Sequence, residues 1–106
     1  MKMYYKTAVN SDRKLSALKA RIYADTGAYA SWGINVIRKA AVHATGPFEI
    51  PNVDIKAYAI YTNNPFCGAM RGFGAAQVPI AYESQMDILA EKLIILPLKF
   101  RKISFY

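Results

Sequence analysis

The chain has 106 residues, of which 54% are hydrophobic and 20% are charged, and it contains a single cysteine. This hydrophobic content can support a folded core. One cysteine excludes an internal disulfide and cannot supply the several ligands that an iron–sulfur cluster or a zinc site requires. Because the sequence has neither a secretory apolar segment nor a run of about 18 apolar residues, we expect a cytoplasmic protein outside the membrane.

The formal net charge is +7, from 14 basic and 7 acidic residues. Such an excess of basic residues is compatible with binding to nucleic acid or to an anionic membrane. The basic residues are spread along the first part of the chain, however, and the one short cluster comprises Lys99, Arg101 and Lys102. A solvated basic surface is therefore the simpler interpretation, and it makes nucleic acid a less favoured partner.

The first expected element is a β-hairpin with arms at residues 3–9 and 14–29. Apolar and polar residues alternate in both arms, and Asn10-Ser11-Asp12 between them is typical of a turn. The second arm also contains several alanines and leucines, so its residues alone are equally compatible with a helix.

A helix of about three turns is expected next. Ser31 is a candidate N-cap, and the pattern stops at Gly46-Pro47. Arg38 and Lys39 fall in the C-terminal half, where the helix dipole favours cations. The apolar positions with near-helical spacing are Ile34, Ile37, Ala41 and Val42.

An extended segment follows Pro51, and residues 53–61 alternate with the period of a half-buried strand. An amphipathic helix is expected over residues 75–93. On its surface, Glu83 and Asp87 lie four residues apart, so we expect them to be solvated or to form salt bridges with Arg71 or Lys92.

Residues 62–77 join this strand to this helix and are the most informative part of the chain. Gly68, Gly72 and Gly74 allow positive φ values and a close approach to a ligand. Between them, Arg71 offers a rigid fork of donors suited to an oxyanion, and Phe73 adds a flat apolar face. A glycine loop that precedes a helix N-terminus is typical of anion sites.

Five ordered motifs together resemble the molybdenum-binding subunits of the xanthine dehydrogenase and aldehyde oxidase family. The resemblance covers nearly the whole chain and favours a strand in the second hairpin arm. The motifs are DTGAYASWG at residues 25–33, HATGPFEIPNV at 43–53, YAIYTNNP at 58–65, TNNPFCGAMRGFGAAQ at 62–77 and AYESQMDILAEKL at 81–93.

The resemblance implies an α+β fold with the order hairpin, helix, strand, glycine loop and helix. Residues 1–106 would form a single partial domain, a fragment of a molybdopterin-binding domain inside a subunit of several hundred residues. It further implies that Arg71 contacts the molybdenum cofactor, that Gly72 and Gly74 leave room for it, and that Phe73 flanks an aromatic substrate.

The substrate remains open between purines, other N-heterocycles and aldehydes. In purine-oxidising members of the family, an arginine that contacts the substrate lies four residues before the histidine of the HATGPF motif. That position is Lys39 here, with Arg38 next to it, so the resemblance implies that Lys39 or Arg38 meets a polar edge of the substrate. Since a lysine cannot reproduce a bidentate guanidinium, purine specificity does not follow from the resemblance.

The family's base glutamate is absent from this chain, so we assign no catalytic residue and no metal ligand, and we expect the isolated chain to be inactive. Iron–sulfur clusters and FAD would belong to partner chains or domains, alongside the rest of the molybdenum subunit. One alternative is a docking or remnant fragment that can oligomerise through exposed strand edges. Another is a nucleic-acid module with stacking residues Tyr4, Tyr5, Tyr58 and Tyr61.

Several single residues have plain structural interpretations. Gln77 is expected to cap or brace the following helix, His43 to have a structural role, and Cys67 to be a small buried thiol. Where the family usually carries a glycine and an aspartate before a proline, residues 94–97 read Ile-Ile-Leu-Pro. We therefore expect the stop of the preceding helix to be lost, and the final residues 101–106 to expose aromatic side chains.

Overall fold

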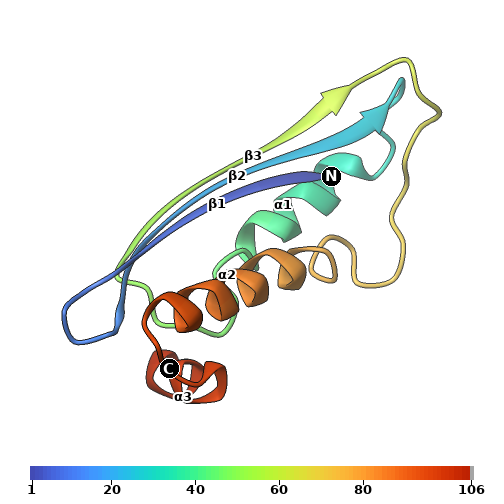
Figure 1. Ribbon diagram of the computed structural model, residues 1–106. Coiled ribbons are helices and arrows are strands. Elements are labelled where there is room, and N and C mark those ends of the chain that lie inside the picture. Colours follow the sequence, from blue (N-terminus) through green and yellow to red (C-terminus); the bar gives the residue numbers. More distant parts are fainter. Residues whose placement is uncertain (106) are drawn as a thin grey trace.

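The computed structural model describes residues 1–105, which form a curved three-stranded sheet with helices on one face (Figure 1). The mixed α+β class is therefore confirmed. The Cα radius of gyration is 15.2 Å and the principal extents are 47 × 23 × 21 Å. A compact domain of this length has a radius of about 13 Å, so the chain is elongated. Within these residues, no helix combines the length and apolar character needed to cross a membrane.

The predicted hairpin is present as β1 (Lys2–Val9) and β2 (Leu15–Gly27), paired antiparallel. The side-chain oxygen of Asn10 accepts a hydrogen bond from the amide of Lys14 at 2.9 Å, and Arg13 adopts φ 62° in the turn. The helical alternative for the second arm is wrong, and the strand ends at Gly27 rather than at Tyr29.

β3 (Asn52–Tyr61) lies parallel to β2, which makes β2 the central strand. A parallel pair needs a crossover, and α1 (Gly33–Val42) provides it. The expected alternation is confirmed in the middle of β3, where Ile55, Ala57 and Ala59 pack against the core while their neighbours are exposed. At its two ends it fails, because Val53 and Tyr61 are 46% and 67% exposed.

The main core lies between the sheet and the two helices α1 and α2 (Val78–Lys92). Small side chains on β2 and α1 let the helix backbone approach the sheet closely, in the manner of close-packed interiors. The fully or nearly buried members are Ile22, Ala24, Ile37, Ala40, Ala44 and Val78.

A second cluster packs beneath α2 and includes α3 (Pro97–Ser104), a helix that the sequence patterns did not predict. Its core residues are Leu15, Phe48, Met86, Ala90 and Phe100. The aromatic rings of Phe48 and Phe105 stack at 5.4 Å, although Phe105 stays 44% exposed. The expectation of exposed terminal aromatics is thus met in part at Phe105, while Tyr106 lies outside the described residues.

Arg101 of α3 joins the two last helices by ion pairs. Its Nε lies 2.8 Å from Glu83 Oε2, and its Nη1 lies 2.8 Å from Asp87 Oδ1. The salt-bridge interpretation of the two acids is confirmed, but their partner is Arg101 instead of Arg71 or Lys92. The pairing was invisible in the sequence because α3 itself was not predicted.

The boundaries of α1 differ from the prediction. The helix begins at Gly33 and has no side-chain cap, and Ser31 adopts φ 43° two residues earlier. A residue in this left-handed conformation does not have the extended backbone of an N-cap, so the predicted cap is wrong. The helix also ends at Val42, four residues before Gly46.

The expected loss of the stop after α2 is also wrong. The amide of Ile94 donates to the carbonyl of Glu91 at 3.1 Å, and the amide of Ile95 donates to that of Ala90 at 3.0 Å. These two bonds form a Schellman motif, in which the residue with left-handed φ is normally glycine. Here Ile94 takes that place with φ 54° and is 92% exposed.

The second face of the sheet carries no helix (Figure 1). Tyr23 and Tyr58 stack on this face with centroids 5.1 Å apart, and Tyr4 meets Tyr23 edge to face at 6.1 Å. Tyr5 lies on the opposite face, where its hydroxyl donates to the carbonyl of Ala44 at 3.1 Å. Tyr5 therefore cannot belong to a surface stacking platform, which removes it from the nucleic-acid alternative.

Candidate functional site

The glycine loop leaves the end of β3, passes the start of α1 and enters α2 (Figure 1). Its second half coils into three consecutive turns. The bonds run from the amide of Phe73 to the carbonyl of Met70 at 2.9 Å, from Ala75 to Gly72 at 3.0 Å and from Gln77 to Gly74 at 3.3 Å. The helix therefore begins at Val78 and not at Ala75 as predicted, because these turns replace its expected first turn.

Two glycines of this coil have left-handed backbones, with φ 90° at Gly72 and φ 96° at Gly74. A Cβ at Gly74 would overlap the carbonyl oxygen of Val36 in α1, and a Cβ at Gly72 would lie 2.5 Å from the Cβ of Ala76. The fold itself therefore requires glycine at both places. This requirement fixes the coil against α1, independently of any ligand.

Arg71 is exposed and directly precedes Gly72. Among residues 1–105, it has no ion-pair or hydrogen-bond partner. The adjoining N-terminus of α2 has no side-chain cap and no acidic residue in its first turn. The guanidinium therefore offers hydrogen-bond donors to an anion, as do the amides of Val78 and Ile80, whereas Pro79 between them has no N–H.

Phe73 lies in the same coil, half-buried, with φ 53°. Its ring meets the ring of Trp32 edge to face, with centroids 6.0 Å apart and an interplanar angle of 64°. Trp32 is 58% exposed and stands at the start of α1. No sequence pattern singled out this residue, although it lies in the DTGAYASWG motif.

The two cations considered for substrate contact lie on α1, and both are exposed. Val36 and Ala40 mark the side of α1 that meets Gly74. At about 100° per residue, Arg38 points to the opposite side of the helix, while Lys39 lies nearer the coil. Around the axis of α1, Lys39 therefore lies nearer than Arg38 to the side that meets the coil.

Three further residues differ from or refine their sequence interpretation. Gln77 makes no side-chain capping bond, and its Oε1 is buried without a partner among residues 1–105. Cys67 is exposed, so its assignment as a buried thiol is wrong, because the first half of the loop runs over the surface. His43 ends α1 with an exposed side chain.

The start of the loop is tied to the end of β2 by one carboxylate. Asp25 accepts hydrogen bonds from the hydroxyl of Thr62 at 2.6 Å, the side-chain amide of Asn64 at 2.5 Å and the backbone amide of Gly27 at 2.9 Å. In that order, these bonds hold the pKa of Asp25 below its usual range. The partners come from two of the quoted motifs, but only the fold shows that they meet.

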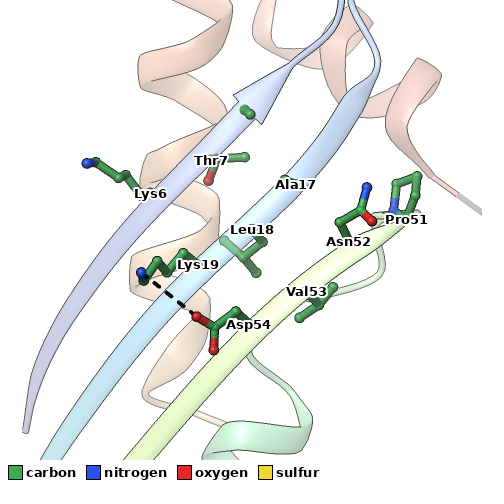
Figure 2. Close-up of a pocket in the computed structure, with 10 residues that line it drawn as sticks. Lys6, Thr7, Ala17, Leu18, Lys19, Pro51, Asn52, Val53 and Asp54 are labelled. Atoms are coloured by element: carbon green, nitrogen blue, oxygen red, sulfur yellow. Dashed lines mark ion pairs between the residues drawn. The ribbon is translucent and has the colours of Figure 1, made fainter.

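A groove elsewhere on the molecule is a separate feature. It is an open groove of about 750 Å³ on the helix-free face, near the start of β3 and so at the opposite end of the sheet from the loop (Figure 2). Ala17 and Val53 are among its lining residues, and Lys19 Nζ lies 4.0 Å from Asp54 Oδ2. Because Arg71 does not line this groove, the candidate site is the coil and its surroundings.

The chain belongs to the molybdopterin cofactor-binding domain family, whose model matches residues 1–105. The nicotinate dehydrogenase large molybdopterin subunit of Eubacterium barkeri is 46% identical over 101 residues, which are 95% of this chain and 24% of that protein. A probable xanthine dehydrogenase component of Bacillus subtilis is 40% identical over 102 residues, which are 96% and 14% of the two chains.

A solved structure supports the same assignment. The aldehyde oxidoreductase from Desulfovibrio desulfuricans superposes with a TM-score of 0.92 at 27% identity, over 98% of this chain and 12% of that one. The family resemblance inferred from the motifs is thus confirmed. The chain spans about a quarter or less of the length of these relatives.

Proposed function

We propose that this chain forms part of the molybdopterin and substrate site of a xanthine dehydrogenase-like molybdenum hydroxylase. The observation that supports this most directly is Arg71, an exposed guanidinium on a glycine coil at the open N-terminus of α2. The family match supports the kind of cofactor. The activity of a whole enzyme is part of the proposal, since the chain matches only a portion of its relatives.

The residues of the coil fit an anionic group that also carries hydrogen-bond donors. Arg71 and the first amides of α2 would bind its anionic part. The buried Oε1 of Gln77, which has no partner within residues 1–105, offers an acceptor close by. Gly72 and Gly74 would keep side chains out of the approach to the coil.

When bound, the molybdenum cofactor accepts two electrons from the substrate, while water supplies the oxygen of the product. The residues of this chain would bind the cofactor and orient the substrate, because none of them is assigned as the base of the reaction. The base would come from another part of the subunit, so we expect the isolated chain to be inactive. Electrons would leave through iron–sulfur and FAD partners.

For the substrate, we favour an aromatic N-heterocycle over an aliphatic aldehyde. The rings of Phe73 and Trp32 meet at the coil that also carries Arg71, and such rings bind flat aromatic molecules by stacking and edge contacts. Lys39, on the nearer side of α1, would meet a polar or anionic edge of the ring. The relative from Eubacterium barkeri is a nicotinate dehydrogenase, which agrees with this class.

The remainder of the site would come from a partner that supplies the rest of the molybdenum subunit. The open sheet face supports this, as do three apolar side chains near the C-terminal end, Ile94, Leu96 and Leu98, which are 65% or more exposed. The docking or remnant alternative predicts the same exposed surfaces without a cofactor.

The deciding experiment isolates the chain from its own cells under native conditions and measures the mass of the complex and its molybdenum content. We expect molybdenum in a complex much larger than 11.8 kDa. Arg71→Ala should then reduce molybdenum retention, while Arg13→Ala, at the far hairpin turn, should not. A molybdenum-free chain or self-oligomer would overturn the proposal in favour of the remnant fragment.

A further inference from the structure

Two segments that are distant in the sequence, the end of β2 and the residues after β3, meet where the glycine loop begins. The amide of Thr62 donates to the carbonyl of Gly27 at 3.2 Å, and the amide of Ala28 donates to that of Asn64 at 3.2 Å. The amide of Cys67 donates to the carbonyl of Thr26 at 3.3 Å. The first residues of the loop thus run back along the end of β2, joined to it by backbone bonds at three points.

The carboxylate of Asp25 completes this junction. One oxygen accepts from Thr62 and from Gly27, and the other accepts from the side chain of Asn64. Bonds of this kind to an ionised acceptor are about twice as strong as bonds between neutral groups. No other side chain among residues 1–105 bonds to both the hydroxyl of Thr62 and the amide of Asn64.

The backbone at the junction leaves little freedom for another arrangement. Gly27 has φ 71°, and a Cβ there would overlap the carbonyl oxygen of Pro65. Beneath it, the buried hydroxyl of Thr26 donates to the carbonyl of Ile60 at 2.9 Å. The end of β2 is therefore rigid, and Asp25 projects from it as a fixed acceptor.

Between the junction and the coil, the loop has few other attachments. Phe66 and Met70 are 61% and 83% exposed, and a Cβ at Gly68 would meet no atom within 4 Å. The position of this stretch therefore depends on its two ends, the junction at Asp25 and the coil packed on α1.

We propose that Asp25 is a positioning residue, whose carboxylate holds the start of the glycine loop on the end of β2. Together with the coil packed on α1, it fixes the path by which the loop reaches Arg71 and Phe73. It does not touch the proposed cofactor or substrate. The inference that Asp25 holds the loop rests on the contacts described above. The inference that it affects molybdenum retention rests also on the proposed function.

The test uses the pair Asp25 and Asn64 in the full chain. Asp25→Ala removes the acceptor, and Asn64→Asp sets two carboxylates against each other. The double variant Asp25→Asn with Asn64→Asp exchanges the amide and the carboxylate. The side-chain amide at position 25 can then donate to the carboxylate at position 64, and the side-chain oxygen at position 25 still accepts from Thr62. Asp54→Ala, on the same sheet face near the other end, is the control for the loss of an exposed acid.

Amide hydrogen exchange is the readout, because it reports on local opening. In Asp25→Ala and in Asn64→Asp, we expect the amides of Ala28 and Cys67 to exchange about tenfold faster or more, corresponding to the loss of at least one charged hydrogen bond. The double variant should return toward the natural rate, and Asp54→Ala should leave both amides unchanged. Since Asp25 is exposed, the variants should keep the fold, and a urea titration of each confirms it.

Unchanged exchange in Asp25→Ala would overturn the proposal, and so would a double variant no better than Asn64→Asp. Molybdenum content of the native complex separates the two hypotheses. Faster exchange with lost molybdenum supports both. Faster exchange with unchanged molybdenum retention still supports Asp25 as the residue that holds the loop, and it shows that cofactor retention does not depend on this junction.

Discussion

The rings of Trp32 and Phe73 meet edge to face, with centroids 6.0 Å apart. Trp32 is the only tryptophan of the chain, so its fluorescence reports on the glycine coil. An aromatic pair of this geometry contributes about 0.5–1.5 kcal/mol beyond the burial of its area. The contact therefore stabilises the packing of the loop on the start of α1, and it makes the fluorescence of Trp32 a probe of that packing.

Replacing Phe73 tests this link. Phe73→Ala should shift the Trp32 emission to longer wavelength and lower the free energy of unfolding by about 1–3 kcal/mol, since a half-buried ring and its aromatic contact are lost. Emission spectra and urea titrations provide the measurement. Phe66→Ala, which removes an exposed ring of the same loop, is the control and should leave the emission unchanged.

The left-handed Ile94 predicts a stabilising substitution. Ile94→Gly should raise the free energy of unfolding by about 1 kcal/mol, because glycine adopts this φ without the strain of a Cβ. For a chain of this size, the midpoint of thermal unfolding should rise by about 4–8 °C. The side chain is 92% exposed, so little apolar contact is lost.

Ile95→Gly is the matched control for this prediction. The same chemical change one residue later removes a side chain that packs on the second core cluster, and it should destabilise the chain. If Ile94→Gly lowered the melting temperature, the Schellman assignment at the end of α2 would be wrong.

The ion pairs of Arg101 make a third prediction. Arg101→Ala should lower the free energy of unfolding by about 1 kcal/mol, because exposed ion pairs are weak but this guanidinium meets two acids at once. Arg101→Lys should recover only part of the loss, since one ammonium does not reproduce the fork. Urea titrations at low and at high salt measure the effect, and the difference should shrink at high salt. Equal losses in Arg101→Ala and Lys102→Ala would contradict the pairing.

Tyr5 predicts a loss of stability in alkali. Burial, with a smaller contribution from nearby Tyr82, raises the pKa of Tyr5 to about 12 from an ordinary value of 10.0. The folded state therefore favours the neutral phenol, and its contribution is complete below pH 10 and falls as the pH rises toward 12. Tyr5→Phe should be about 1 kcal/mol less stable at pH 7, where the bond to Ala44 is lost.

To check this prediction, the free energy of unfolding is measured at each pH for the natural chain and for Tyr5→Phe, and the difference between the two is followed. That difference should narrow between pH 10 and 12, because only the natural chain has the Tyr5 phenol to ionise. Tyr4→Phe, on the exposed face, should show no such change. A constant difference for Tyr5→Phe across the range would refute the assignment.

Local patterns predicted the sheet well. The alternation in the middle of residues 53–61 and the Asn10-Ser11-Asp12 turn each have a local physical cause, and both were confirmed. Patterns failed where distant contacts decide. Ser31 has the chemistry of a cap but not its backbone conformation, and α3 is held by a core and by ion pairs that its own residues do not reveal.

The candidate site was predictable only through its motifs. Arg71 and its glycines stand together in the sequence, so a loop with an arginine at its centre could be expected. Asp25 is 37 residues from Thr62, and Trp32 is far from Phe73 in the sequence. No periodicity or spacing links such pairs, because the crossover through α1 and the parallel pairing of β3 bring them together.

The strand order also bears on when the site forms. β1 and β2 lie within the first 27 residues and need only a short turn to pair, whereas β3 must wait for the α1 crossover. We expect the glycine loop to be placed after these elements, since it follows β3 and rests on both β2 and α1. We therefore expect substitutions in the loop to change the rate of unfolding much more than the rate of folding.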